Sequence, residues 1–252
     1  MNFLLNILYN FDYKYFFFFL IQSYGLYNLY PVMNFLLCKS EKYSKYNTVK
    51  QYYIIKNLMK SACMAVILFF MIFTFIPNLL NNVWHDTHNR IIGIFYVSND
   101  LAGLMAVPKL PTSTKLHHYT TILLFMIICV MTTEQEDNIA RLIVVYTIFS
   151  CIPYLVNSYL ALRFFYNRED ESKLTESQLR ENKLIDLNRV AAYYLYLGCC
   201  VCNWLYHAIF LINRIRFGEI DLAYTIYYLI LIPIINDDIV LLKWLYTKNL
   251  DL

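Results

Sequence analysis

Residues 61–84 read SACMAVILFFMIFTFIPNLLNNVW, a run without one charged side chain. A helix needs about 20 mostly apolar residues to cross the hydrocarbon core of a bilayer, and this run is long enough to do so. The run therefore predicts a transmembrane helix, and the fold class depends on how often the same pattern recurs.

Runs of this kind recur along the whole chain, with no internal repeat and no second domain between them. The run nearest the N-terminus is the weakest, because Gly25, Pro31 and scattered Tyr and Asn interrupt it. We predict an all-α, polytopic transmembrane bundle of about seven helices, over residues 15–38, 61–84, 91–107, 116–133, 142–162, 190–213 and 222–242.

The composition supports a membrane protein and excludes other classes. Of the 252 residues, 59% are hydrophobic and only 15% are charged, whereas soluble domains carry about 25% charged residues. A disordered chain is excluded, because such chains are polar and poor in aromatic residues. The net charge of +3 gives no broad basic face, so we predict no nucleic-acid partner.

The basic residues predict the orientation. Sixteen of the 21 Lys and Arg residues fall in alternate connections, chiefly 39–60 and 163–189, and in the C-terminal segment. Since connections rich in Lys and Arg stay on the cytosolic side, we predict a cytosolic C-terminus and a lumenal N-terminus. If residues 15–38 do not span, the other six helices keep this orientation.

Several polar groups interrupt the apolar runs. An ionisable group inside a spanning helix costs roughly 2.5–3.5 kcal/mol on insertion scales, so each is a candidate functional residue. Counting the helical rise from the cytosolic boundaries places the polar groups of four helices at similar depth. This layer comprises Asp100, His117, His118, Asn157, Asp237 and Asp238, whereas His207 lies near the opposite end of its helix.

The short connection at Pro108-Lys-Leu-Pro111 makes its two flanking helices antiparallel neighbours, because the two prolines end one helix and start the next. Asp100 and the histidine pair are therefore expected within reach of one another. Adjacent helical residues point about 100° apart, so we expect only one histidine to face a given cavity directly. We predict no metal site, because the other close pair, His85 and His88, falls on the opposite side of the membrane.

The segment Tyr96-Val-Ser-Asn-Asp100, followed by His117-His118-Tyr-Thr-Thr121, resembles the core of the TLC-domain family. That family includes the ceramide synthases and a set of small lipid regulators. Looser similarity continues through Phe149-Ser-Cys-Ile-Pro153 and Leu162-Arg163-Phe, and through residues 210–214 and 236–244. The HDxSD motif of the synthases is absent, which makes the chain more similar to the small members.

The resemblance implies a TLC-like six-helix domain over residues 56–248, preceded by an N-terminal span and basic cytosolic loop over residues 1–55. It also implies residence in the endoplasmic reticulum. In the enzyme hypothesis, acyl-CoA is the co-substrate and a sphingoid base or related lipid amine is acylated, with no other cofactor. The site residues would be His117, His118 and Asp100 as catalytic groups, and Asn157, Asp237, Asp238 and Thr121 as substrate contacts.

The alternative hypothesis is a non-catalytic protein that binds lipid or regulates membrane lipid composition. Its polar layer would hold a headgroup or pin the helices together by hydrogen bonds. The missing HDxSD favours this alternative, and the Asp and His pair favours the enzyme. In both hypotheses the partners are membrane lipids, and the sequence makes no prediction of the oligomeric state.

Overall fold

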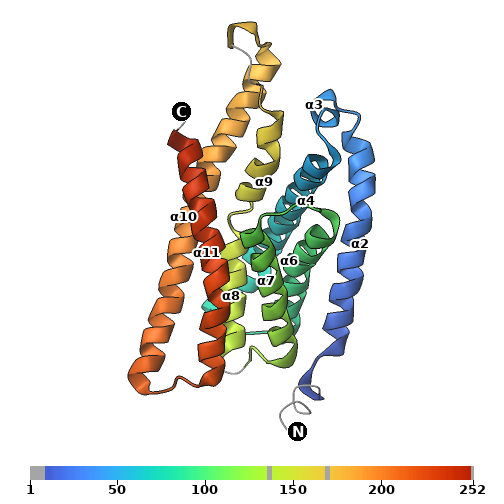
Figure 1. Cartoon of the computed structure of the whole chain (residues 1–252). Helices are drawn as coiled ribbons and strands as arrows, with labels where there is room; N and C mark the ends of the chain where they lie inside the picture. Colours follow the sequence, from blue (N-terminus) through green and yellow to red (C-terminus); the bar gives the residue numbers. More distant parts are fainter. Residues whose placement is uncertain (1–8, 135–137, 168–170, 251–252) are drawn as a thin grey trace.

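A computed structural model describes residues 9–134, 138–167 and 171–250 of the chain. Every regular element within these ranges is a helix, which confirms the all-α prediction. The long helices run side by side along one bundle (Figure 1). In chain order the elements are α2 (Tyr13–Leu37), α3 (Glu41–Ser44), α4 (Thr48–Phe70), the π-helix η1 (Met71–Phe75), α5 (Ile76–Leu80), α6 (Asp86–Ala106), α7 (Thr112–Val130), α8 (Ile139–Cys151), α9 (Leu155–Leu162), the 3-10 turns η2 (Arg163–Phe165) and η3 (Glu171–Lys173), α10 (Glu176–Phe217) and α11 (Leu222–Leu250).

Four helices of the described chain are long and apolar enough to cross a membrane: Thr48–Leu80, Thr112–Val130, Glu176–Phe217 and Leu222–Leu250. A fifth span results if α8 and α9, which are bent by 43° at their junction, are counted together. Residues 15–37 and 91–106 are helical as well, within α2 and α6, but these helices do not pass the same test of length and apolar composition. The structure thus supports a membrane helical bundle with four or five such spans, and the count of seven stays a prediction.

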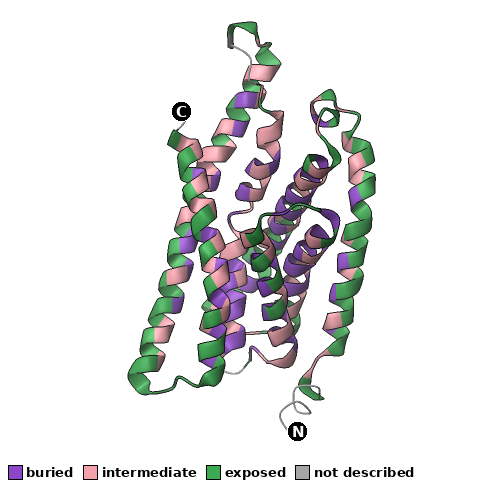
Figure 2. Ribbon diagram, in the orientation of Figure 1, coloured by how far each residue is buried: buried purple, intermediate pink, exposed green. Residues whose placement is uncertain are grey.

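Exposed residues lie on the outer faces of the helices and buried residues lie between them (Figure 2). Large apolar side chains such as Phe69, Phe73 and Leu229 are exposed on the outside of the bundle. Charged side chains, among them Lys56 and Asp100, are buried between the helices. Lipid tails can cover the apolar outside, whereas a charged group in a membrane requires the bundle interior or a wet cavity. The interior is therefore the part of the molecule in which to look for a site.

The proline connection between α6 and α7 forms as predicted. Val107, which precedes Pro108, is extended and ends α6, because proline disfavours the helical conformation in the residue before it. Pro111 precedes the first residue of α7 and is also non-helical. The two helices pack as antiparallel neighbours, which brings Asp100 on α6 close to the histidine pair on α7.

A second proline shapes the bundle at the junction of α8 and α9. Pro153 has no backbone N–H and cannot continue the helical hydrogen bonds, which accounts for the bend between the two helices. The carbonyl oxygen of Tyr154 in the break accepts a hydrogen bond from the Ser61 hydroxyl of α4, 3.1 Å away. The break turns Ser150 and Asn157 toward a common interior space, because both side chains line the same cavity.

The N-terminal helix α2 packs along α6 and buries one face against it, including Phe19 and Tyr30. The backbone carbonyl of Phe19 accepts a hydrogen bond from Ser98 of α6. The proposed division between residues 55 and 56 falls inside α4, which runs without interruption from Thr48 to Phe70. In the structure, α2 is therefore part of the same bundle as the following helices.

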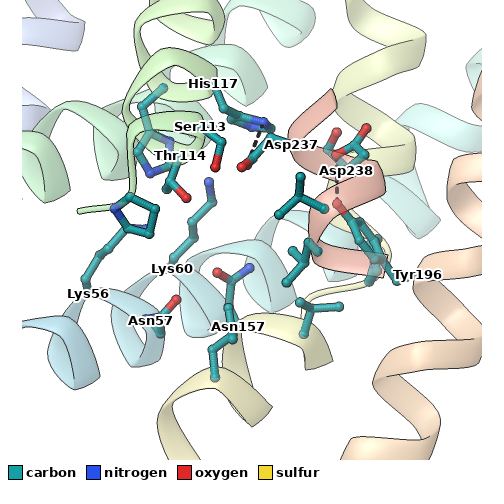
Figure 3. A pocket seen from close by; sticks show the side chains of 18 of the residues that line it. Lys56, Asn57, Lys60, Ser113, Thr114, His117, Asn157, Tyr196, Asp237 and Asp238 are labelled. Atoms are coloured by element: carbon teal, nitrogen blue, oxygen red, sulfur yellow. Dashed lines mark hydrogen bonds and ion pairs between the residues drawn. The ribbon is translucent and has the colours of Figure 1, made fainter. Parts of the chain in front are cut away.

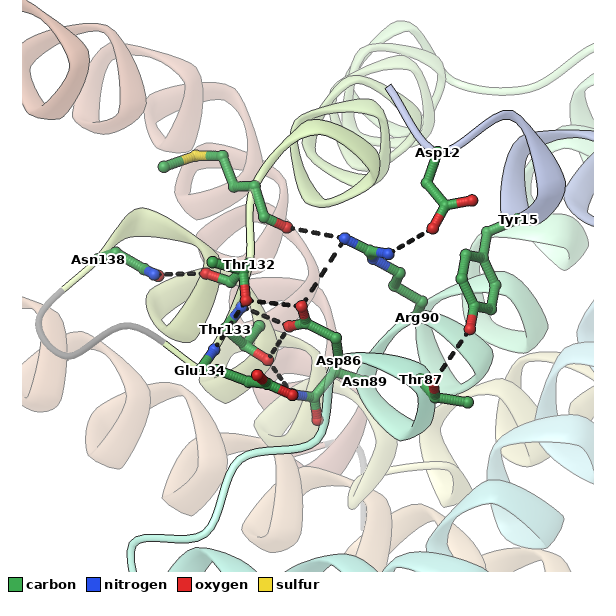
Figure 4. Close-up of polar contacts among 11 residues, drawn as sticks. Asp12, Tyr15, Asp86, Thr87, Asn89, Arg90, Thr132, Thr133, Glu134 and Asn138 are labelled. Atoms are coloured by element: carbon green, nitrogen blue, oxygen red, sulfur yellow. Dashed lines mark hydrogen bonds and ion pairs between the residues drawn. The ribbon is translucent and has the colours of Figure 1, made fainter. Parts of the chain in front are cut away.

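The end of the bundle that holds the start of α2 and α6 is tied by polar contacts (Figure 4). The carboxylate of Asp86 accepts hydrogen bonds from the Thr132 and Thr133 hydroxyls, each at 2.6 Å, and from the Thr133 backbone N–H. Arg90, one turn further along α6, forms an ion pair with Asp12 at 2.6 Å. Burial alone would raise the pKa of Asp86, but these hydrogen bonds and the nearby guanidinium hold that pKa below its ordinary value. We call these five residues the polar clamp.

Candidate functional site

The predicted pairing of Asp100 with the histidine pair is present, and His118 is the partner. Asp100 is fully buried, and its Oδ1 lies 3.0 Å from Nδ1 of His118. The same oxygen lies 2.5 Å from the ammonium of Lys60 on α4, whose side chain is only 7% exposed. The hydroxyl of Thr121 donates a hydrogen bond of 2.9 Å to the other carboxylate oxygen. Three helices are thus joined through one carboxylate.

His117 has a different carboxylate partner. Its Nδ1 lies 3.4 Å from Oδ2 of Asp237 on α11. Figure 3 shows the two side chains pointing toward one another across the cavity wall. Each histidine therefore has a carboxylate beside its Nδ1, although the two carboxylates come from different helices. The sequence predicted Asp237 as a substrate contact and did not foresee that it faces His117.

These groups surround a cavity of about 340 Å³ between the helices (Figure 3). Both histidines line it, which corrects the expectation that only one would face it directly. The expectation was wrong because α7 sits between α6 and α11, so side chains about 100° apart on α7 still meet a shared space. The wall also includes the predicted residues Asn157, Asp237 and Asp238.

Asp100 and Thr121 lie behind this wall and are not among its lining residues. The Thr121 hydroxyl contacts Asp100 and also the backbone carbonyl of His118, one turn earlier on α7. Thr121 was predicted as a substrate contact. Its position instead suits a residue that holds Asp100 in place for His118.

Asn157 and Asp238 contribute polar atoms from two further helices. The side-chain amide of Asn157 has a sulfur acceptor, Sδ of Met64 at 3.4 Å, which is a weak hydrogen-bond partner. Asp238 is firmly held, because the hydroxyls of Tyr146 and Tyr196 each donate to it at 2.7 Å. Asn157 thus has donor capacity to spare, and Asp238 is held in place by one hydroxyl donor on each of its oxygens.

Two cationic residues of the site on α4 were missed by the sequence analysis. Lys56 and Lys60 were assigned to a cytosolic loop, but they lie on α4, are buried, and line the cavity. Together with Asn57 and Met64 they recur at helical spacing on one face of α4. That spacing was visible in the sequence, but counting every Lys as a topology signal concealed it.

His207 lies outside the site, as predicted from its depth. Its Nδ1 is 2.9 Å from the carbonyl oxygen of Asn203, and its Nε2 is 3.0 Å from the Tyr227 hydroxyl. Both ring nitrogens are therefore satisfied. His207 is a packing residue between α10 and α11, in contrast to the pair on α7.

The histidine pair is incompletely satisfied. Both ring nitrogens of His118 and the Nδ1 of His117 are buried without a hydrogen bond of good geometry. Leaving a buried polar atom unsatisfied costs about 1–3 kcal/mol, so such atoms require an explanation. A ligand or a substrate proton that completes these contacts would remove the cost.

Asp100, His117 and His118 also place one possible metal-ligand atom each within 4.8 Å of one another. The ammonium of Lys60 lies against Oδ1 of Asp100, so a cation bound by this carboxylate would lie close to it. Two positive charges at one carboxylate repel each other strongly in a buried site. The donor set therefore suits proton transfer better than it suits a metal ion.

Comparisons of the chain with protein-family models, with curated proteins and with solved structures found no match. The similarity to the TLC-domain family consequently rests on the sequence motifs described above.

Proposed function

We propose that this chain is a multi-pass membrane protein of lipid metabolism that transfers an acyl group from a CoA thioester to a lipid amine. We take the amine to be a sphingoid base or a related lipid and the membrane to be that of the endoplasmic reticulum. The observation that carries the proposal is the cavity between the helices with two imidazoles in its wall, each with a carboxylate beside its Nδ1.

A carboxylate at Nδ1 is the arrangement that prepares an imidazole to act as a base. It favours the tautomer with the proton on Nδ1 and stabilises the imidazolium that forms when Nε2 accepts a proton. We assign this role to His118, since Asp100 is fully buried and its position is set by both Lys60 and Thr121. His117 with Asp237 is the second pair of the same kind.

In the proposed reaction the amine nitrogen attacks the thioester carbonyl carbon. His118 accepts the proton that the amine loses as the carbon–nitrogen bond forms, and the carbon–sulfur bond then breaks. The departing thiolate takes up that proton, so the histidine is regenerated and the products are an amide and free CoA. The amide of Asn157 and the ammonium of Lys56, both on the cavity wall, are suited to stabilise the negative charge on the carbonyl oxygen.

One observation favours the non-catalytic alternative. Lys60, Asp100, Thr121 and His118 join α4, α6 and α7 through short polar contacts, as a purely structural network would. In that case the cavity would bind a lipid headgroup without turning it over. The alternative and the enzyme proposal differ in what the histidine does, and substitution of His118 separates them.

The test is mass spectrometry of the purified chain in lipid nanodiscs, supplied with a sphingoid base and isotopically labelled acyl-CoA. We expect wild type to form labelled N-acyl product and His118→Ala to lose activity by at least a hundredfold, since general-base catalysis contributes about 10²–10⁴-fold. His85→Ala is the matched control, because His85 is exposed at the far end of the bundle, near the polar clamp.

A wild-type protein that is monodisperse but forms no labelled product from this amine would overturn the acyl-transfer proposal. Product formation by His118→Ala at the wild-type rate would remove His118 from the chemistry. If His118→Ala loses its sharp thermal transition as well as activity, the network is structural and the lipid-binding alternative gains support.

A further inference from the structure

A second cavity adjoins the first. It has a volume of about 310 Å³ and lies between α9, η2, α10 and α11, toward the end of the bundle where α11 finishes (Figure 1). Among the residues that the structure describes, its wall holds three cationic side chains, Arg163, Arg189 and Lys248, and one carboxylate, Asp186. The excess of positive charge makes it suited to an anion.

The guanidinium groups in this wall have hydrogen-bond donors to spare. Nε and one terminal nitrogen of Arg189 are buried without a hydrogen-bond partner of good geometry, although Asp186 lies 3.0 Å from that terminal nitrogen. The Arg189 side chain is only 12% exposed, so bulk water does not satisfy these atoms well. Nε of Arg163 is likewise buried and unpartnered.

Aromatic rings hold Arg163 in position. Its guanidinium carbon lies 4.5 Å from the ring centre of Trp244 and 5.0 Å from that of Phe164. Contacts with ring faces fix the plane of the guanidinium but leave its N–H edge available. A planar fork of donors fits a phosphate oxygen pair, and arginine is the residue that recognises phosphate in this way.

The two cavities share part of their walls. Arg163 and Trp244 line both of them. The two cavities are therefore adjacent and meet at this pair of side chains. The histidine pair lines the first cavity, and the guanidinium groups of Arg163 and Arg189 line the second.

We infer that the second cavity binds the phosphate ester of a ligand whose reactive or apolar part occupies the first cavity, with Arg189 and Arg163 as the phosphate contacts. The inference deepens the proposed function, on which it rests for its choice of ligand. Two kinds of molecule carry the required group: a CoA thioester from the aqueous phase and a phospholipid from the bilayer.

The test is binding to the purified full-length chain, which does not depend on turnover. Titration calorimetry with CoA in phosphatidylcholine nanodiscs forms one arm. The shift in unfolding temperature caused by phosphatidic acid, relative to phosphatidylcholine, forms the other. Arg189→Gln is expected to weaken the binding of the true ligand about tenfold to a hundredfold, the loss expected for one charge-assisted hydrogen bond.

Two further variants complete the design. Arg180→Gln removes the same charge from an exposed position on the same helix and should bind as wild type does. Arg189→Lys keeps a cation beside Asp186 but lacks the fork of donors, and it should fall between wild type and Arg189→Gln. If Arg189→Gln folds poorly, the Arg189→Lys variant alone tests whether the guanidinium contributes to binding.

Loss of CoA binding in Arg189→Gln would support the inference with the soluble thioester as ligand. Loss of the phosphatidic acid effect would support it with a lipid headgroup as ligand. The inference is overturned if Arg189→Gln and Arg180→Gln are equal to wild type in both arms. If the protein binds one of these ligands through Arg189 but forms no acyl product, the inference about the second cavity is supported and the acyl-transfer proposal is overturned.

Discussion

At the scale of single residues, one buried carboxylate carries much of the site. Asp100 contacts a lysine, a threonine and a histidine from two neighbouring helices. Removing one partner of a buried ion pair leaves the other charge buried without a counter-charge. The resulting loss of folding free energy is far larger than the net contribution of the intact pair. The substitutions that test chemistry at this position therefore also test stability.

Lys60→Met is expected to lower the free energy of unfolding by about 3–5 kcal/mol, because it leaves Asp100 buried without its cation. The measurement is thermal or denaturant unfolding of the purified protein in detergent. Combining Lys60→Met with Asp100→Asn removes both charges and should recover part of the loss. A Lys60→Met protein as stable as wild type would show that the pair is not buried as described.

The residue scale also shows what could be predicted. The proline connection and helical rise sufficed to place Asp100 beside the histidine pair, because those residues are close in the chain. The contact between His117 and Asp237 could not be predicted, since it depends on how α7 and α11 pack across a long stretch of sequence. Lys60 was missed because its charge matched a topology rule that made no use of helical spacing.

At the scale of elements, α6 is the helix that others approach closely. It packs against α2, α4 and α7, and it presents glycine to two of them. A Cβ at Gly93 would lie 3.1 Å from the ring of Phe125 on α7. Phe125 is almost fully buried, so its ring has little room to move. The close approach of α6 and α7, which positions Asp100 and His118, depends on this glycine.

We therefore expect Gly93→Ala to destabilise the protein by about 1–3 kcal/mol through overpacking. Gly198→Ala on α10 is the matched control, since no atom lies within 4 Å of its added Cβ. There alanine should be neutral or stabilising by up to about 1 kcal/mol, owing to its better helix propensity. Unfolding temperatures of the two variants in one detergent give the comparison. Equal values for both would contradict the close packing of α6 on α7.

The elements also explain why the predicted spans were only partly supported. Most residues of the predicted ranges are helical, because apolar runs of that length favour helices both in water and in a bilayer. A helix with polar side chains can lie inside the bundle when neighbouring helices cover those side chains. The helix α6 is such a case, because its polar residues, among them Asn89 and Asp100, are buried and lower its mean hydropathy. The helices α2 and α6 are long enough to span a membrane, but they are less apolar than the four helices that pass the test of length and apolar composition.

At the scale of the whole molecule, the bundle has two dissimilar ends. One end holds the polar clamp, which joins the starts of α2 and α6 to the connection after α7. The other holds both cavities and most of the basic residues. The first end is held by polar contacts, and the second contains the cavities of the proposed sites.

The clamp predicts how stability depends on pH. Because the folded pKa of Asp86 lies below its ordinary value, its contribution is present above pH about 4 and is lost as the pH falls through the folded pKa. Unfolding temperatures measured between pH 6 and 3 should therefore fall more steeply for wild type than for Asp86→Asn, which has no carboxylate to protonate. Parallel curves for the two proteins would exclude a role for this carboxylate.

The length of α10 has a consequence for how ligands arrive. Its 42 residues extend roughly 63 Å, about twice the thickness of a hydrocarbon core. One end of the helix must consequently project into the surrounding water. The charged first third, from Glu176 to Arg189, is the part that can do so, and it carries Asp186 and Arg189 with it. In the proposed reaction, the water-soluble thioester would therefore enter from the aqueous phase at this end of α10 and the lipid amine from the bilayer, without either one changing phase.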